Sequence, residues 1–415
     1  MRTGLALVST IAATGTAQPL FQTIGGLTGR NGSSFAHDLS RDGLTVVGAS
    51  VNASGGTEAF AWTEGVGIRP LQRLPGVSAT AFSGELFAVD GDGSTAVGVA
   101  SNSAGVRRPV IADVDAGTLR EMDFPPGTSI EIPNAISADG GTAVGSYNPP
   151  FAAPTGFRYN IATNKLDNLP ATLIGNDTAV NGSIIVGFTQ GGTGGAYLIR
   201  ASGPFFLAPL NPATPITVAN AISDNANFIV GTARDGSALR PARWLIAGPP
   251  IALYDGPDVR TANAEDVSED GNWVVGSYFP SGGFFGAGWI WDTWRGFRSI
   301  EHALTVETGF DLSRFSEFRV AGISASGARI AGNVRDSLTG EGTAFVAELN
   351  QFGCNRADMT FPFGVLSQTD VSEFVDRFFQ EDSRVTAFAP PDDVASQADV
   401  AVFVDLFFGG CPGAR

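Results

Sequence analysis

The chain has 415 residues, a formal net charge of −16, 54 glycines and 24 prolines, and only 16% of its residues are charged. This composition favours many short strands joined by tight turns over long helices, and 30 phenylalanines with 6 tryptophans supply enough apolar surface to exclude a disordered chain. The negative charge argues against a nucleic-acid partner, because phosphates require a basic footprint.

The first 17 residues are typical of a secretory signal peptide. Arg2 is followed by a mostly apolar stretch over residues 5–13, and the small residues Gly15, Thr16 and Ala17 precede Gln18. The alternative is a buried strand at the start of the fold. No later segment has 18 continuous apolar residues, so we expect no membrane span and a secreted or cell-surface location.

A repeat fills residues 18–350. In each copy a short apolar strand leads to a Ser/Asp/Asn/Gly turn, and a second apolar strand then ends in Gly, as in LSRDG (39–43) followed by VVG (46–48). Asp-Gly and Asn-Gly pairs provide the positive φ values of tight hairpin turns. The closing glycines are Gly48, Gly98, Gly145, Gly187, Gly231, Gly276 and Gly332, with spacings of 50, 47, 42, 44, 45 and 56 residues.

Each copy has room for two further strands, such as residues 59–62 and 68–71 in the first copy. Four strands in about 45 residues make one propeller blade. We therefore predict an all-β, seven-bladed β-propeller of four-stranded antiparallel blades. Residues 21–27 resemble the fourth strand that the last copy lacks, so we expect the N-terminal strand to close the ring and remove an exposed edge. A solenoid is the alternative architecture.

Segments of the first copy resemble the HAF repeats of bacterial extracellular proteins. They are SFAHDLS (34–40), the Asp-Gly to Val-Val-Gly core, and EAFAW (58–62). The resemblance extends over residues 20–350 and implies an exported repeat protein of no established activity.

The last 65 residues, 351–415, are predicted to form a second, helical domain. Residues 362–379 and 391–408 match at 11 of 18 positions with an offset of 29. Each copy has four apolar residues at helical spacing, which predicts two amphipathic helices packed face to face. These residues are Val371, Phe374, Val375 and Phe378 in the first helix and Val400, Phe403, Val404 and Phe407 in the second.

Cys354 and Cys411 are the only cysteines and bracket this domain. In an exported protein this arrangement favours one disulfide, which would stabilise a domain of this size. The alternative is two free, buried thiols.

This segment also resembles the GC-type dockerin-like domain found at the C-terminus of bacterial surface proteins. The matching residues are Cys354, Ala357-Asp358, residues 362–366, Asp370-Val371 and residues 410–412. The resemblance implies a role in surface attachment, with a cohesin-type partner as an analogy. It also implies a relation to EF-hand loops, in which Asp358, Asp370 and Asp399 would hold Ca²⁺.

Too few alternating oxygens remain in these loops for a calcium site, because residues 361–363 are Phe-Pro-Phe and Ala387 replaces the leading Asp of the second loop. We therefore expect no cofactor, and we expect Asp370 and Asp399 to act as helix N-caps.

Catalytic signals are weak. His37 and His302 are the only histidines, and neither has a histidine or cysteine at metal-ligand spacing. No Gly-x-Ser-x-Gly motif is evident. The most visible carboxylates recur at one hairpin turn of successive copies, which indicates turn residues. They are Asp42, Asp90, Asp92, Asp139, Asp224 and Asp270. A pair of carboxylates acting as acid and base stays open.

The loops between second and third strands should gather on one face of a propeller. Two of them are aromatic and provide the candidate ligand-binding residues Tyr147, Phe151, Tyr278, Phe284 and Phe285. The alternative is that these rings fold back onto Trp289, Trp291 and the blade edge.

The sequence predicts a non-enzymatic binding or surface-display module with no catalytic residues. Its partner would be a cell-surface or extracellular-matrix protein or polysaccharide. The alternative is an extracellular carbohydrate-active enzyme, a glycoside hydrolase or lyase, that uses carboxylates of the loop face.

Overall fold

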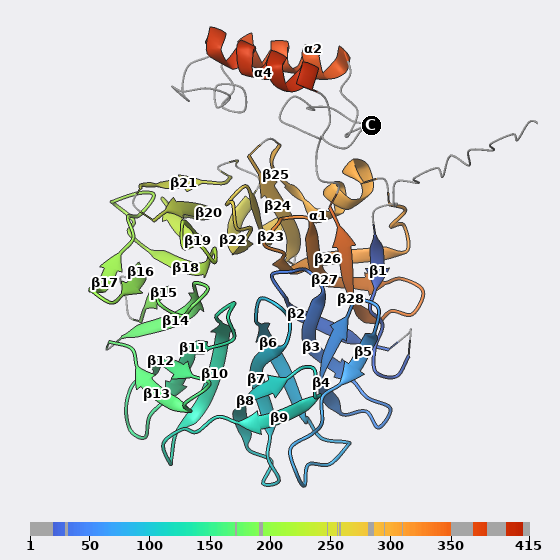
Figure 1. Ribbon diagram of the computed structural model, residues 1–415, viewed down its shortest axis with the longest axis vertical. Coiled ribbons are helices and arrows are strands. Elements are labelled where there is room, and N and C mark those ends of the chain that lie inside the picture. Colours follow the sequence, from blue (N-terminus) through green and yellow to red (C-terminus); the bar gives the residue numbers. More distant parts are fainter. Residues whose placement is uncertain are drawn as a thin grey trace, which may run out of the picture.

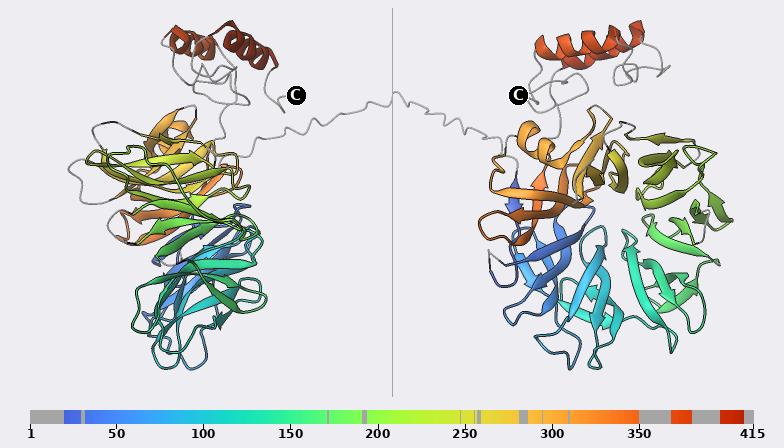
Figure 2. Two further views of the ribbon diagram at one scale, coloured as in Figure 1. Left: turned by 90° about the vertical axis from the view of Figure 1, so that its left-hand side faces the viewer. Right: turned by 180° about the vertical axis from the view of Figure 1, so that it is seen from behind.

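The computed structural model of the chain describes residues 20–29, 32–170, 172–190, 194–246, 248–254, 256, 259–280, 286–293, 295–308, 310–349, 368–379 and 396–409. Up to residue 349 these are mostly antiparallel strands, arranged in sheets around a common centre (Figure 1; seen from behind in Figure 2, right). The expected signal peptide (1–17) and both cysteines of the expected disulfide lie outside the described residues.

Four sheets each contain four antiparallel strands in chain order, with the first strand innermost. The first sheet has β2 (Ser34–Leu39), β3 (Thr45–Val51), β4 (Thr57–Thr63) and β5 (Gly67–Pro70). The second has β6 (Gly84–Val89), β7 (Thr95–Ser101), β8 (Arg107–Asp113) and β9 (Thr118–Glu121). The third has β10 (Ser129–Ile136), β11 (Thr142–Asn148), β12 (Thr155–Asn160) and β13 (Lys165–Asn168). The fourth has β14 (Leu173–Thr178), β15 (Ile185–Thr189), β16 (Ala196–Arg200) and β17 (Gly203–Phe206).

An eight-stranded sheet follows and consists of two such units, joined by one parallel residue pair, Leu239 with Thr261. One unit has β18 (Thr217–Ile222), β19 (Phe228–Asp235), β20 (Ala238–Leu245) and β21 (Pro250–Ala252). The other has β22 (Val259–Val267), β23 (Trp273–Pro280), β24 (Ala287–Asp292) and β25 (Gly296–Ser299).

The last sheet joins the two ends of the repeat region. Its strands are β26 (Phe315–Ile323), β27 (Arg329–Asp336), β28 (Gly342–Glu348) and, outermost, β1 (Phe21–Thr23). β1 pairs antiparallel with β28, Phe21 opposite Ala347 and Thr23 opposite Phe345. This pairing confirms the expectation that the N-terminal strand completes the last copy.

The closing glycine of each repeat has a steric cause. The first strand of each unit carries a β-bulge opposite this glycine, between Ala36 and Asp38 in β2, for example. A Cβ on Gly48 would lie 1.9 Å from the carbonyl oxygen of Phe35, and a Cβ on Gly332 would lie 2.1 Å from that of Arg319. Only glycine fits there, so the Val-Gly signature marks the bulge.

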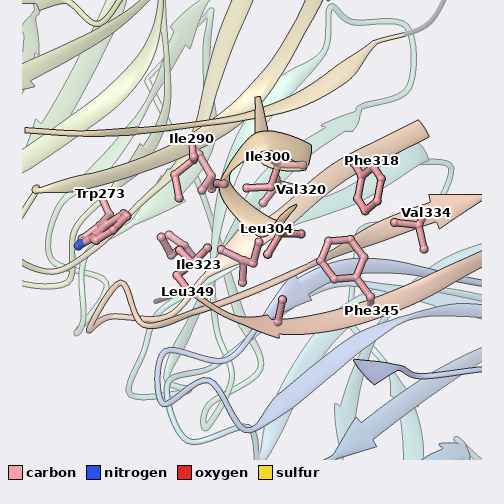
Figure 3. Packing of buried hydrophobic residues seen from close by; sticks show 14 of the residues in the cluster. Trp273, Ile290, Ile300, Leu304, Phe318, Val320, Ile323, Val334, Phe345 and Leu349 are labelled. Carbon is pink, nitrogen blue, oxygen red and sulfur yellow. The ribbon is translucent and has the colours of Figure 1, made fainter. Parts of the chain in front are cut away.

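Apolar side chains fill the spaces between neighbouring units. The largest described cluster lies where β22–β25 meet β26–β28 and includes Trp273, Ile290, Phe318 and Phe345 (Figure 3). The short helices α1 (Ile300–His302) and η1 (Ala303–Glu307) lie in the connection between these units and add Ile300 and Leu304 to the same cluster.

The C-terminal segment contains α2 (Gln368–Phe379) and α4 (Gln397–Gly409). Phe374 and Phe403 are buried and stack with ring centroids 4.0 Å apart. Val375, Val400 and Val404, expected on the packed face, are 41%, 36% and 40% exposed. The apolar contact is therefore narrower than the sequence pattern predicts and depends mainly on the phenylalanines. In the part of the chain that the structure describes, no helix is both long and apolar enough to span a bilayer.

Candidate functional site: the axial cavity and the loop face

The innermost strands enclose a cavity of about 180 Å³, here called the axial cavity. The bulges turn one side chain from each innermost strand towards it. These bulge residues are His37, Phe87, Asn134, Asn176, Asn220, Glu265 and Ala321. The same backbone irregularity that requires the repeated glycine therefore determines which side chains line the cavity.

Three bulge residues tie neighbouring units together. The Asn134 side-chain amide donates to the Gly175 carbonyl oxygen at 2.8 Å, that of Asn176 to Ala219 at 2.9 Å, and that of Asn220 to Ala264 at 2.7 Å. Each acceptor lies on the innermost strand of the next unit, so these amides act as connectors.

Three aspartates directly after bulge residues make similar ties. Each accepts one backbone N–H from its own strand and one from the next unit. Asp38 accepts from Leu39 at 2.8 Å and Val89 at 2.9 Å. Asp177 accepts from Thr178 at 2.7 Å and Ile222 at 2.8 Å. Asp266 accepts from Val267 at 2.7 Å and Ile323 at 2.8 Å.

At one end of the cavity, the hairpin turns between first and second strands are linked in a closed cycle, here called the turn ring. Its hydrogen bonds run from Asp42 N–H to Gly91 O, Gly91 N–H to Ala138 O, Asp139 N–H to Val180 O, Val180 N–H to Asp224 O, Asn225 Nδ2 to Glu269 O, Glu269 N–H to Ala325 O, and Ala325 N–H to Arg41 O. The cycle returns to the turn from which it starts, so the units are joined around the whole circumference.

Arg41 lies across this end of the cavity. Its Nε donates to Asp224 at 3.1 Å and its Nη1 to Asp266 at 3.4 Å, and both terminal nitrogens donate to the carbonyl oxygen of Val267 at 3.2 Å. The Arg41 side chain is 16% exposed, so the guanidinium is largely removed from water. One residue of the first unit thus bridges to the fifth and sixth units in chain order.

Burial has the largest effect on the pKa values of the side chains that line the cavity. It raises the pKa of Asp177 to about 7, although N–H donors from Ile222 and Thr178 oppose the shift. Burial likewise raises the pKa of Asp38, Asp266 and Glu265 and lowers the pKa of His37, against the effect of Glu85.

Arg41 behaves in the opposite way. Burial alone would lower its pKa, but the carboxylates of Asp266 and Asp224 outweigh that effect and raise it. The guanidinium therefore stays charged and neutralises part of the acidic cavity.

The cavity suits structural linkage better than turnover of a large substrate. Its volume of about 180 Å³ is below the roughly 300–1,000 Å³ of ordinary ligand pockets. Its aspartates also accept backbone N–H groups that would lose their partners if the carboxylates turned towards a substrate.

The loop face lies at the opposite end of the innermost strands from the turn ring. Tyr147 is 3% exposed, donates to Asn168 Oδ1 at 2.8 Å and packs on Phe124. Tyr278 is half-buried against Trp289 and Phe297. These two rings fold inward, as the alternative interpretation expected, whereas Phe284 and Phe285 lie outside the described residues.

Phe151 remains on the surface. Phe151 is fully exposed, and its backbone is left-handed with φ 58°. A bulky residue in this conformation costs about 1–2 kcal/mol. Pro149 and Pro150 precede it, and Pro150 lies against Gly127. The turn therefore presents the ring to solvent from a strained backbone.

Other candidate residues have structural roles. The His37 ring packs edge-on against Phe87 at 5.7 Å, and His302 is exposed on α1. Asp42, Asp139 and Asp270 accept from Ser40, Ser137 and Ser268 within their turns, as expected. Asp224 differs, because its carboxylate binds Arg41 in another unit.

The described part of the C-terminal segment gives Asp399 a specific role. Asp399 is buried, and its Oδ2 accepts from Ser396 N at 2.9 Å and Ser396 Oγ at 2.7 Å. Ser396 directly precedes α4, so Asp399 belongs to a capping box rather than being the N-cap itself. Asp358 and the side chain of Asp370 lie outside the described part. No group of three or more His, Cys, Asp or Glu side chains suited to a metal occurs in the described ranges.

Sequence reasoning missed Arg41 and the three aspartates Asp38, Asp177 and Asp266. A signal for the aspartates existed, since each stands two residues before the first turn residue of its copy. Nothing in the sequence distinguishes Arg41, whose partners are 183 and 225 residues away.

No protein-family model matches the sequence, and no curated protein matches it. Solved structures resemble it in fold. A prolyl endopeptidase aligns with TM-score 0.50 and 12% identity over 77% of this chain and 50% of its own. TolB from Acinetobacter baumannii aligns with TM-score 0.42 and 12% identity over 75% of this chain, which spans 65% of TolB. The β-propeller domain of the Trilobed protease from Pyrococcus furiosus aligns with TM-score 0.45 and 11% identity over 63% of this chain and 81% of its own. The four-stranded sheets around a common centre make the fold β-propeller-like, and identities this low carry no functional conclusion.

Proposed function

We propose that the chain is an exported, non-enzymatic binding module, a seven-bladed propeller whose loop face recognises a cell-surface or extracellular polysaccharide or protein. Four-stranded units, turns linked in a ring and the pairing of β1 with β28 support this architecture. One contrast supports this function. The acidic side chains of the cavity link the units to one another, whereas Phe151 on the loop face is exposed on a strained backbone and is free to contact a partner.

The chemistry of the loops favours a neutral partner surface. The loops that contain residues 52–56, 102–106 and 149–154 have no charged residue, although the whole chain has a net charge of −16. An aromatic ring among Gly, Ser, Asn and Pro offers a flat apolar surface with few competing charges. Such a surface suits stacking on uncharged sugar rings, so a neutral polysaccharide is the first partner to test.

The test is a polysaccharide array probed with the full-length protein and with Phe151→Ala. We expect the wild type to retain at least one neutral polysaccharide and the variant to lose most of that binding. The matched control is Phe205→Ala, which removes an exposed ring from the rim strand β17. Equal binding by wild type and Phe151→Ala, or no binding at all, would refute recognition through Phe151.

The carbohydrate-active enzyme is the second candidate, and one observation favours it. Carboxyl groups with raised pKa line the axial cavity, and such groups are suited to acid–base catalysis. Glu265 is the test residue because it lines the axial cavity and makes none of the ties between units described above. Release of reducing ends or unsaturated products by the wild type, lost in Glu265→Gln, would favour the enzyme.

The C-terminal segment is proposed to be a dockerin-like attachment domain closed by a Cys354–Cys411 disulfide. The duplicated helices and the Phe374–Phe403 stack support a compact helix pair. In this proposal residues 1–17 direct export, the HAF-type repeats form the recognition region, and the terminal domain holds the protein at the cell surface.

A further inference from the structure

The turn between β6 and β7 has a carboxylate at a position where five other units have a serine and the β14–β15 turn has Ala179. Ser40, Ser137, Ser223 and Ser268 begin the equivalent turns, and each hydroxyl donates to the side chain two residues later, at 2.5, 2.6, 2.8 and 2.6 Å. In the β6–β7 turn this position is Asp90. A carboxylate thus replaces a hydroxyl donor, while Asp92 remains in the acceptor position.

The replacement leaves a buried oxygen without a partner. Asp90 is 3% exposed, and Ser94 Oγ donates to its Oδ2 at 3.2 Å. Asp90 Oδ1 is buried and has no hydrogen-bond donor among the described residues. An unsatisfied carboxylate oxygen in such a position is costly unless a positive group neutralises it. Asp90 also lies against the next turn, where a Cβ on Gly140 would be 2.8 Å from its Oδ2.

The oxygens around this position match the preferences of a hard cation. Asp90, Asp92 and Ser94 alternate along the turn sequence Asp-Gly-Asp-Gly-Ser, and alternating side-chain oxygens in an Asp/Gly turn are the ligands that Ca²⁺ takes in EF-hand loops. Asp92 is exposed, so a cation reaches the turn from solvent and retains water ligands. Mg²⁺ demands a smaller, near-octahedral site and gives up water reluctantly, which makes Ca²⁺ the better fit.

We infer that the β6–β7 turn is a Ca²⁺ site in which Asp90, Asp92 and Ser94 supply the protein oxygens. The bound ion takes the place of the serine hydroxyl that five of the other turns have, and it strengthens the turn at its contact with Gly140. Two carboxylates with water ligands place the affinity in the weak range of about 10⁻⁴–10⁻³ M. The inference is independent of the proposed recognition function.

The experiment follows thermal unfolding of the full-length, EDTA-treated protein at pH 7.5 in CaCl₂ or MgCl₂ up to about ten times the expected dissociation constant. At that ratio a single site raises the folded-to-unfolded ratio about eleven-fold. Calorimetric titration with CaCl₂ counts the bound ions, since any ion held by the C-terminal segment would add to the total.

Asp90→Ser introduces the residue that five of the other turns have, and Asp90→Asn provides an amide donor in nearly the same shape. We expect both variants to be at least as stable as the wild type without Ca²⁺ and to bind one ion fewer. Asp42→Asn, which removes a carboxylate from the β2–β3 turn, should keep the wild-type response. The inference is overturned if the wild type does not respond to CaCl₂, if the Asp90 variants respond as it does, or if MgCl₂ stabilises it equally.

Discussion

Removal of the Arg41 side chain is the most informative perturbation of the axial cavity. Arg41 donates to three acceptors, and the two hydrogen-bonded carboxylates, Asp224 and Asp266, have side chains only 20% and 18% exposed. Glu269 adds a third carboxylate, 4.0 Å from Arg41 Nη2. In Arg41→Ala these carboxylates and the Val267 carbonyl lose the guanidinium donor and its positive charge, although Asp266 keeps its two backbone N–H donors. Breaking a buried ion pair costs about 3–5 kcal/mol. Because this one has partial access to water, we expect the free energy of unfolding to fall by about 3 kcal/mol.

The thermal shift follows from the size of the repeat region. An unfolding entropy of about 2.1 cal/mol/K per residue gives roughly 0.7 kcal/mol/K for the propeller, so the Tm should fall by about 4 °C. Tryptophan fluorescence during urea and thermal unfolding measures both quantities. The loss should shrink as the pH falls from 8, because burial raises the pKa of Asp266 and its protonated carboxyl group no longer needs the guanidinium.

Arg335→Ala is the matched control, since Arg335 pairs with Glu317 at 3.7 Å with side-chain exposures of 54% and 37%. An exposed pair of this kind contributes about 0–1 kcal/mol. If Arg41→Ala is no more destabilising than Arg335→Ala, the role of Arg41 as a bridge across the cavity is refuted.

Two further predictions concern the ties between units. Burial raises the pKa of Asp177 to about 7. The stabilising contribution of its protonated form is therefore complete below the unfolded pKa of about 4 and is lost as the pH rises through 7. In urea unfolding, the stability advantage of wild type over Asp177→Asn should be larger at pH 4.5 than at pH 8, and a constant difference would contradict the raised pKa. Asn333 accepts from Ala36 N at 2.8 Å and donates to Ala36 O at 2.9 Å, joining the last unit to the first. Asn333→Ala should lower the free energy of unfolding by about 2–4 kcal/mol, because two buried backbone groups lose their partners. Asn333→Asp should cost less, because it keeps the acceptor. Similar stabilities for the wild type and both variants would exclude this tie.

Local chemistry made much of the fold predictable. The Asp-Gly turns and Val-Gly strands recur because hairpin geometry and the bulge require them in every copy, as the close approach at Gly48 illustrates. The pairing of residues 21–23 with the last copy was predictable because that copy lacked a fourth strand.

The candidate site was harder to predict because its contacts join distant copies. Asp38 meets Val89 across 51 residues, and Arg41 meets Asp266 across 225. A single copy contains neither partner. Tyr147 shows the other limit, since the structure places it on β11 rather than in the loop, with its ring against Phe124 and its hydroxyl bonded to Asn168. Phe151 is exposed and has a left-handed backbone, and its sequence context specifies neither.

The closed ring is the central claim, and hydrogen exchange of the N-terminal strand tests it most directly. Ile24 N–H donates to Ala344 O at 2.8 Å, and Glu348 N–H donates to Leu20 O at 2.7 Å. Peptides covering residues 20–24 should therefore exchange as slowly as peptides from β28, because both strands open only when the last unit opens. Exchange of residues 20–24 at the rate of an unpaired tail, while β28 stays protected, would contradict the closed ring.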